Sequence, residues 1–225
     1  MERAQRMGEA QKTAREILDD LATAVDDRVP TLRVLRKEWS GRLAALDSDT
    51  VVQIGTALVD SEDSPRWFTY ELIHYHGEAL AALDLTTLIR LGRGMSAWDE
   101  TDPFGTLLSG VVWRNGGMAD ADVMAWTKSE DRWWRRVALV STVALNNRAR
   151  GGKGDPARTL PLCEALAPDR DDMVVKALSW ALRTLIHWDR AAVEGFLAEH
   201  DDVLAPRVVR EVRNKLDSGL KNPKR

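Results

Sequence analysis

The sequence predicts an all-α fold. Apolar residues recur at helical spacing along the chain, and no segment shows the period-two alternation bounded by hairpin turns that indicates β-strands. Aspartate, serine or proline precedes most of these segments, as is typical where helices begin. Acidic turns recur at intervals long enough for two helices, which favours a HEAT-like helical-repeat solenoid of antiparallel helix pairs with a concave groove.

The predicted helices follow one another without long interruptions. In the first part of the chain they are residues 3–25, a helix opened by Pro30, one capped by Ser48 or Asp49, Trp67–His76 after Ser64-Pro65, and Leu85–Leu91 after Asp84. The next are a helix that starts at Pro103 or just before it and ends at Trp113, Val123–Thr127 after Asp120, and one capped by Ser129 that runs through Asn146. Asp155-Pro156, Asp169, Asp189 and Asp202 open the last ones.

The repeat predicts which side chains meet. The acidic turns lie at Glu62-Asp63, Asp99, Glu130-Asp131 and Asp169, and their aspartates Asp63, Asp99, Asp131 and Asp169 are 36, 32 and 38 residues apart. In a solenoid, the second helices of successive pairs line one surface. We therefore expect one groove to collect the following residues: Arg66, Trp98, Asp102, Arg136, Lys176 and Trp180. Residues 1–217 are predicted to form a single domain, and 218–225 a flexible basic tail.

Composition narrows the class of protein. Of 225 residues 44% are hydrophobic, so the chain can bury a sizeable core. The single cysteine, Cys163, excludes an internal disulfide and fits a reducing cytoplasm. No apolar run approaches the length of a membrane span, and the N-terminus is polar, so a cytoplasmic protein without membrane contact is expected.

Charge is unevenly distributed. The net charge of −3 argues against indiscriminate binding of nucleic acid. Residues 128–153 and 206–225 nevertheless each contain seven basic residues against two acidic ones. These segments predict a positive face for a polyanion, with a solvated charged surface as the alternative.

The segment Trp98–Pro103 places an indole and a carboxylate four residues apart, which is about one helical turn. Because a residue before proline avoids helical geometry, one solution is a single turn from Trp98, followed by Asp102 as the cap of a helix that begins at Pro103. In either arrangement the carboxylate lies at the positive end of a helix and is expected to be ionised. A cap and a core indole are the structural alternative.

Three stretches resemble the AlkD-type DNA alkylation repair glycosylases, a HEAT-like all-α family. Trp98–Asp102 looks like the family's W-D-x-V-D signature. Trp133–Leu139 is similar to its W-x-x-R-x-A-I helix, and Val175–Arg183 resembles its K-A-I-G-W-x-L-R helix. Their order and spacing also match. Thr101 and Ser179 depart from the family's valine and glycine, and the first 60 or so residues match only loosely.

The resemblance implies a DNA glycosylase that excises cationic N3- or N7-alkylated purines from duplex DNA without flipping the base. It implies that Asp102 is the catalytic carboxylate, that Trp98 and Trp180 are the active-site indoles, and that Arg136 contacts a phosphate. We add three further DNA-binding candidates: Arg135, Lys176 and Arg210. The expected partner is alkylated duplex DNA, and the chain is expected to act as a monomer without metal or other cofactor.

The chemistry explains why one carboxylate is enough. Glycosidic bond cleavage passes through an oxocarbenium-like sugar, and ordinary glycosidases use a second carboxyl group to protonate a neutral leaving group. An alkylated purine is already cationic and leaves without an acid. The carboxylate then stabilises the sugar cation and holds the attacking water, while indole faces attract the cationic groups by about 0.5–2 kcal/mol each.

Alternative hypotheses remain. For Trp180 the alternative is a core residue, and for Arg136 it is an ion pair with Asp131 or Glu130 on its own helix. His74 and His76 lie two apart on a helix and face away from each other, so they do not predict a metal site. At the level of function, the alternatives are a non-catalytic scaffold that binds DNA or a protein in the groove, and a protein-interaction solenoid without a nucleic-acid role.

Overall fold

The computed structural model describes residues 2–61 and 63–223, with side chains from residue 7 onward. Within these residues the chain is helical and contains no strand, which confirms the predicted all-α class. Glu62 of the first acidic turn and Lys224 and Arg225 of the basic tail lie outside the described residues. The chain divides into two compact units, Met1–Gly94 and Met95–Arg225, which are described separately. The single domain over 1–217 stays a prediction.

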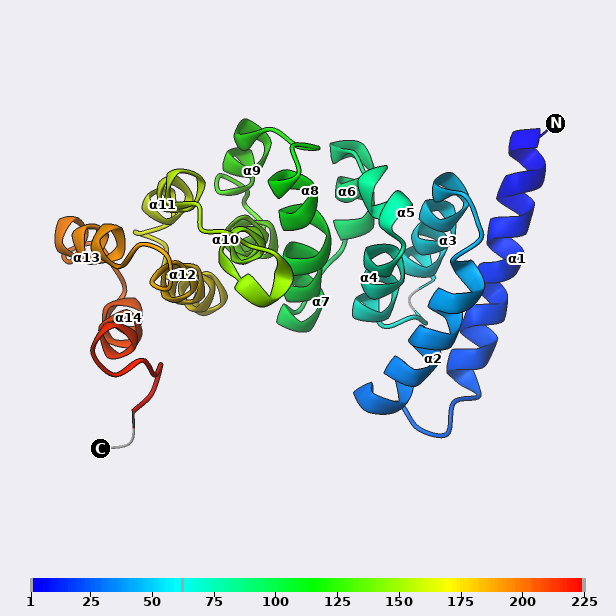
Figure 1. Cartoon of the computed structure of the whole chain (residues 1–225), viewed down its shortest axis with the longest axis horizontal. Coiled ribbons are helices and arrows are strands. Elements are labelled where there is room, and N and C mark those ends of the chain that lie inside the picture. Colours follow the sequence, from blue (N-terminus) through cyan, green and yellow to red (C-terminus); the bar gives the residue numbers. More distant parts are fainter. Residues whose placement is uncertain (1, 62, 224–225) are drawn as a thin grey trace. The chain divides into compact units, whose positions relative to one another are not determined.

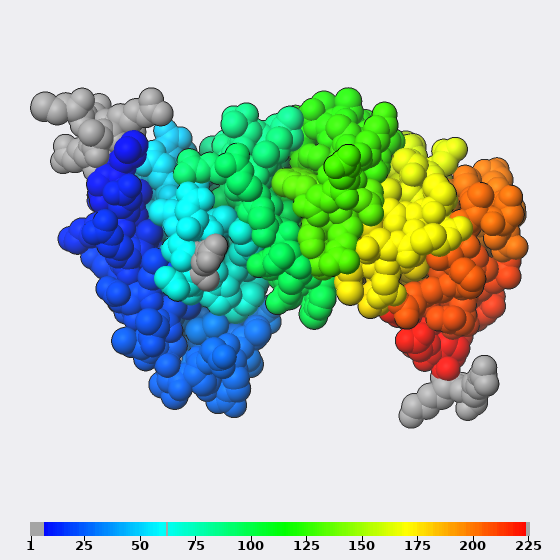
Figure 2. Space-filling model, turned by 180° about the vertical axis from the view of Figure 1, so that it is seen from behind, coloured from blue at the N-terminus to red at the C-terminus, as the bar shows by residue number. Residues whose placement is uncertain are grey.

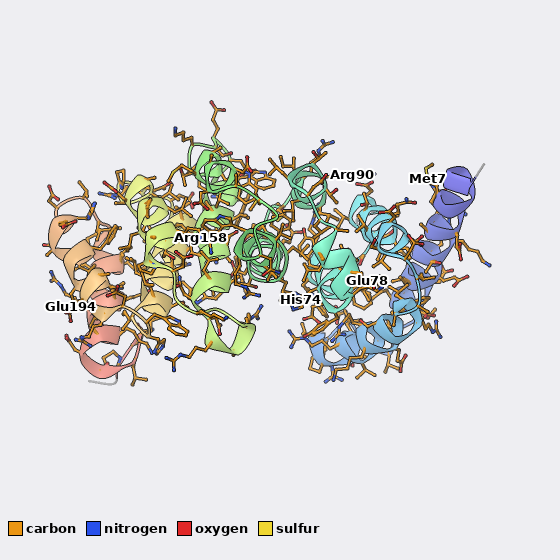
Figure 3. The ribbon with its side chains drawn as sticks, turned by 45° about the horizontal axis from the view of Figure 1, so that its top comes forward. Met7, His74, Glu78, Arg90, Arg158 and Glu194 are labelled. Atoms are coloured by element: carbon orange, nitrogen blue, oxygen red, sulfur yellow. The ribbon has the colours of Figure 1, made fainter. Side chains whose placement is uncertain are left out.

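The first unit contains six helices among its described residues. They are α1 (Glu2–Ala22), α2 (Val29–Leu43), α3 (Ser48–Asp60), α4 (Arg66–Tyr75), α5 (Gly77–Ala81) and α6 (Leu85–Gly92). Helix α3 packs against α1 on one side and against α4 on another, and α2 packs against α4 (Figure 1). Arg90 of α6, labelled in Figure 3, forms an ion pair of 3.0 Å with Asp60 of α3, which links these two helices at the surface.

The second unit holds the candidate site. Its elements are α7 (Trp98–Pro103), the π-helix η1 (Phe104–Ser109), α8 (Gly110–Arg114), α9 (Asp120–Trp126), α10 (Arg132–Asn146), the short 3₁₀ helix η2 (Arg148–Arg150), α11 (Pro156–Ala165), α12 (Asp172–Leu185), α13 (Arg190–Glu199) and α14 (Pro206–Ser218). In Figure 2 its segments follow one another in chain order as successive bands of colour.

This unit is built in two layers. Helices α10, α12 and α14 pack side by side, and η1 and α8 continue that layer against α10 (Figure 1). Helices α9, α11 and α13 form the other layer and pack against α10 and α12. The interface between the layers is apolar, since α10 buries Val137, Leu139, Val140 and Val143 completely. This is the stacking of helix pairs expected for a helical repeat.

The helix after Trp98 differs from one of the predicted arrangements. It begins at Trp98 after the N-cap residue Ala97 and runs through Pro103 into η1 and α8 without interruption. Asp102 therefore lies inside the helix, and its predicted role as a cap before Pro103 is wrong. The cap comes instead from Glu100, whose Oε2 accepts hydrogen bonds from the main-chain nitrogens of Ser96 and Ala97 at 2.6 and 3.2 Å.

Several other caps lie next to the predicted residues. Asp47 rather than Ser48 or Asp49 caps α3, Asp131 rather than Ser129 caps α10, and Asp171 rather than Asp169 caps α12. In each case a carboxylate accepts a hydrogen bond from a main-chain nitrogen two or three residues further on. Helix α14 begins at Pro206 after Ala205 and not at Asp202.

Candidate functional site

Asp102 and Arg136 form a forked ion pair between α7 and α10. Arg136 donates from Nε to Oδ1 and from Nη2 to Oδ2 of Asp102, both at 2.9 Å, and donates from Nη1 to the carbonyl of Met173. The Arg136 side chain is only 6% exposed and that of Asp102 19%. The geometry is the planar, bidentate one that guanidinium and carboxylate groups prefer. Arg136 therefore pairs with Asp102 and not with Asp131 or Glu130, which were the alternative.

Trp98, Arg136 and Trp180 line one cavity of about 360 Å³ in the second unit. Trp98 is 57% exposed at the start of α7, and Trp180 lies half-buried on α12. Asp102 is not part of this lining but is bound to Arg136, which is, and it follows Trp98 by one helical turn. The helix from Trp98 thus puts the indole and the carboxylate on the same face, as the four-residue spacing predicts.

Burial dominates the electrostatics of Asp102. It raises the pKa of this carboxyl group, because desolvation disfavours the charged form, while the hydrogen bonds and charge of Arg136 act to lower the pKa and Asp99 raises it further. The expected influence of a helix N-terminus is small at this position, since Asp102 lies beyond the first turn. The charge of the carboxylate is therefore stabilised chiefly by the guanidinium.

The other residues predicted to bind DNA have different surroundings. Arg135 donates from Nε to Asp169 at 2.8 Å and from Nη1 to the carbonyls of Ser129 and Glu130. Lys176 lines the cavity and forms an ion pair of 2.6 Å with Asp172. Arg210 is exposed on α14. Their contact with DNA stays a prediction.

The structure adds three cavity residues that the sequence did not single out as site residues: Met173, Arg183 and Lys221. Arg183 lies three residues after Trp180 and seven after Lys176, so the helical period of α12 was a signal for it. Lys221 gave no such signal. It follows α14, where its carbonyl accepts a hydrogen bond from Asn214, and its Nζ lies 3.4 Å from Glu211.

Residues that the sequence set aside have structural roles. The ring of His76 accepts a hydrogen bond from Ala79 at the start of α5 and contacts the carbonyl of Leu46. Cys163 is completely buried, which raises the pKa of its thiol.

Arg66, which was expected near the groove, donates to the carbonyls of Leu91 and Arg93 within the first unit. Among the described residues, no cluster of three or more metal-ligating side chains occurs.

A family model described as DNA alkylation repair enzyme matches residues 7–216. The chain belongs to this family. The match spans both units and includes all three stretches that carry the resemblance in the sequence, and it associates the protein with the repair of alkylated DNA. Comparison with curated proteins and with solved structures gave no match. In the described part of the chain, no helix is both long and apolar enough to span a bilayer.

Proposed function

We propose that the protein is a DNA glycosylase that hydrolyses the N-glycosidic bond of cationic N3- and N7-alkylated purines in duplex DNA. The observation that carries the proposal is the cavity lined by Trp98, Arg136 and Trp180, with the carboxylate of Asp102 paired to the Arg136 guanidinium. The substrate in this proposal develops positive charge on the sugar and already carries it on the base. The two indoles supply cation–π contacts and the carboxylate supplies the opposing charge.

Asp102 retains the capacity to act although it is paired. A carboxylate offers about four lone-pair sites, and the fork of Arg136 occupies one on each oxygen. The remaining sites and the exposed 19% of the side chain serve a water molecule and the oxocarbenium-like sugar. Arg136 keeps the carboxylate ionised and fixes its orientation, so that little reorganisation accompanies the charge that develops in the transition state.

The charge of the leaving group follows from the residues around the cavity. The lining residues include four cations (Arg136, Lys176, Arg183 and Lys221) but no carboxyl group that can protonate a departing base. The lining therefore lacks the acid that ordinary glycosidases use, which favours a base that leaves without an added proton. An N3- or N7-alkylated purine meets this requirement and an undamaged purine does not.

The proposal includes recognition without base flipping, which the family resemblance implies. Trp98 is largely exposed and Trp180 is half-buried, so the indoles border a cavity that is open to the surface. A lesion approaching from solvent contacts their faces while it remains within the duplex. Arg136, with Arg135, Lys176 and Arg210, is proposed to contact the DNA backbone, which fixes register and not sequence.

The test compares two classes of lesion in duplexes of identical sequence. The purified protein is incubated with DNA containing 7-methylguanine or 3-methyladenine, and with DNA containing uracil or hypoxanthine, and the freed bases are quantified by chromatography. We expect release of the methylated purines above the spontaneous rate and none of the neutral bases. Equal release of both classes would overturn the charge argument, and release of neither would overturn the enzymatic proposal.

One observation favours a second candidate. Both oxygens of Asp102 are bound by Arg136, as they would be in a purely structural ion pair between α7 and α10. In that case the protein is a scaffold that binds DNA or a protein in the groove without excision. Duplex binding without any base release would support this candidate over the glycosylase.

A further inference from the structure

A second cavity adjoins the candidate site. It has a volume of about 460 Å³ and lies between the end of α10, η2, α12 and α14. It shares Trp180 and Arg183 with the first cavity, so the two spaces meet along α12. Arg148, His187 and Lys215 also line it, and none of its lining residues is acidic. We call this second space the basic recess.

One face of α12 connects the two cavities. Lys176, Trp180 and Arg183 lie at positions i, i+4 and i+7, and His187 follows at i+11 in the turn after the helix. At the helical rise, this row extends about 16 Å. One strand of duplex DNA carries a phosphate about every 3.4 Å along the axis, so a face of this length meets several phosphates of a strand.

The cations of the basic recess, one of which (Arg183) also lines the first cavity, differ in their partners from the other cations of the first cavity. Arg136, Lys176 and Lys221 each form an ion pair with an aspartate or glutamate. Arg148, Arg183 and Lys215 form no ion pair with a carboxylate of the described residues. Their contacts are with neutral groups: Arg148 lies over the ring of Trp188, Arg183 donates to the Ser179 hydroxyl at 3.1 Å, and Lys215 to the Gly219 carbonyl at 2.6 Å.

Arg183 reaches the nearest carboxylate only through a neutral group, since the Ser179 hydroxyl to which it donates is bound to Glu211 at 2.7 Å. The Arg183 side chain is partly buried, and desolvation lowers the pKa of its guanidinium although the charge of Glu211 acts to raise it. Its Nε binds Ser179, whereas Nη1 and Nη2 have no hydrogen-bond partner in the described part of the chain. A partly desolvated cation gains most from an anion that binds several of its donors at once, as phosphate does.

We propose that the basic recess binds a backbone phosphate of the strand whose damaged nucleotide occupies the first cavity. The inference rests on the proposed function for the identity of the DNA, and it assigns Arg148, Arg183 and Lys215 as a second phosphate contact beyond Trp180. Because Arg148 and Lys215 have no protein carboxylate to release, their full charge is available to the phosphate. The recess fixes the position of the strand relative to Trp180 and takes no part in bond cleavage.

The test measures the salt dependence of binding to undamaged duplex DNA, which requires no catalysis. The full-length chain is compared with Lys215→Gln, Arg148→Gln and the double variant, and each Kd is determined at several potassium chloride concentrations. Each lost phosphate contact is expected to reduce the slope of log K against log salt by about 0.9, and the double variant by about 1.8. An unchanged slope in all three variants would overturn the proposal.

Arg213→Gln is the matched control. Arg213 lies on the same helix as Lys215, two residues away and so on the other side, and it pairs with Asp201 at 2.7 Å. Arg213→Gln removes the same charge from the chain as Lys215→Gln. Its slope of log K against log salt should nevertheless equal that of the parent. A reduced slope in Arg213→Gln as large as that of Lys215→Gln would show a general effect of charge and overturn the assignment of the recess.

Base release provides a second readout. For Lys215→Gln acting on methylated DNA, we expect a higher KM and an unchanged kcat, since the recess positions DNA away from the reacting bond. A lower kcat at unchanged KM would contradict the proposal. If the parent protein releases no base, the glycosylase proposal fails, but the slopes on undamaged duplex still decide whether the recess binds a phosphate.

Discussion

At the scale of single residues, the Asp102–Arg136 pair carries the account. Removing one partner of a buried, forked ion pair leaves an uncompensated charge and costs about 3–5 kcal/mol. The pair is therefore both a structural link between α7 and α10 and the source of an oriented carboxylate beside the two indoles. These two roles are separated by variants that keep the charge and change the geometry.

Replacing Arg136 with lysine should shift the pH dependence of base release. Asp102 must be ionised to stabilise the sugar cation, so the rate falls as the pH drops through its pKa, which burial raises. Arg136→Lys keeps a cation but loses the two-pronged hydrogen bonding that lowers this pKa. We expect the acid limb of kcat/KM to move to higher pH, measured after subtraction of spontaneous release.

Arg135→Lys is the control for that shift. Arg135 is the adjacent residue and binds Asp169 instead of Asp102, so its replacement should leave the acid limb in place. If the limb moves equally in both variants, or in neither, the ionisation of Asp102 does not govern the rate.

Sequence reasoning succeeded for residues whose partners are local and failed where the partner is distant. The shared face of Trp98 and Asp102 followed from their spacing within one turn. For Arg136 the resemblance implies a phosphate contact, and the acids of its own helix are the alternative, but the partner in the structure lies 34 residues away. No pattern in the sequence shows which of several aspartates the packing of α7 on α10 brings within reach.

At the scale of elements, the continuous helix from Trp98 to Arg114 determines where the site residues lie. Pro103 removes a main-chain donor and crowds the preceding turn, and the π-helix η1 follows directly. Sequence rules predicted a helix boundary at this proline because a residue before proline usually avoids helical geometry. Packing outweighed that local preference, since Phe104 and Leu108 are completely buried.

The close crossing of this helix with α10 gives a prediction for Gly110. A Cβ atom at Gly110 would lie 2.4 Å from the Ser141 carbonyl oxygen and 2.6 Å from that of Gly105. Both are main-chain atoms, so Gly110→Ala must shift the helix and should lower the free energy of unfolding by about 1–3 kcal/mol. Urea denaturation followed by tryptophan fluorescence measures the change.

Gly195 on α13 is the matched control for this substitution. A Cβ atom there would meet nothing within 4 Å. Gly195→Ala should leave stability unchanged or raise it by about 0.4–1 kcal/mol, because alanine restricts the unfolded chain. A neutral Gly110→Ala would show that the two helices are not as closely packed as described.

At the scale of the whole molecule, the distribution of charge partners matters more than the net charge. A chain with a net charge of −3 was expected to avoid indiscriminate binding of nucleic acid, and its basic segments were expected to form a positive face. The structure shows that Arg135 and Arg213 of these segments pair with neighbouring acids, whereas Arg148 and Lys215 in the basic recess contact neutral groups. Counting charges along the sequence does not distinguish the two groups, because pairing depends on tertiary contacts.

The all-α class was predictable because the helical period of apolar residues and the caps are local properties. The cavity required the side-by-side packing of α10, α12 and α14, which the repeat spacing anticipated for Trp98, Arg136 and Trp180. The place of Lys221 was not predictable, since the segment after α14 has no periodic pattern and was expected to be a flexible tail.

The most direct measurement of the central claim is single-turnover release of 7-methylguanine from duplex DNA by the parent, Asp102→Asn and Asp99→Asn. Asparagine retains a carbonyl oxygen for Arg136, so circular dichroism and duplex binding should show a folded, DNA-binding protein. Asp99 lies exposed in the first turn of α7, and its replacement controls for loss of a nearby negative charge. The account predicts a loss of about 10²–10³-fold for Asp102→Asn and a rate close to the parent for Asp99→Asn. Equal release by Asp102→Asn and the parent would contradict it.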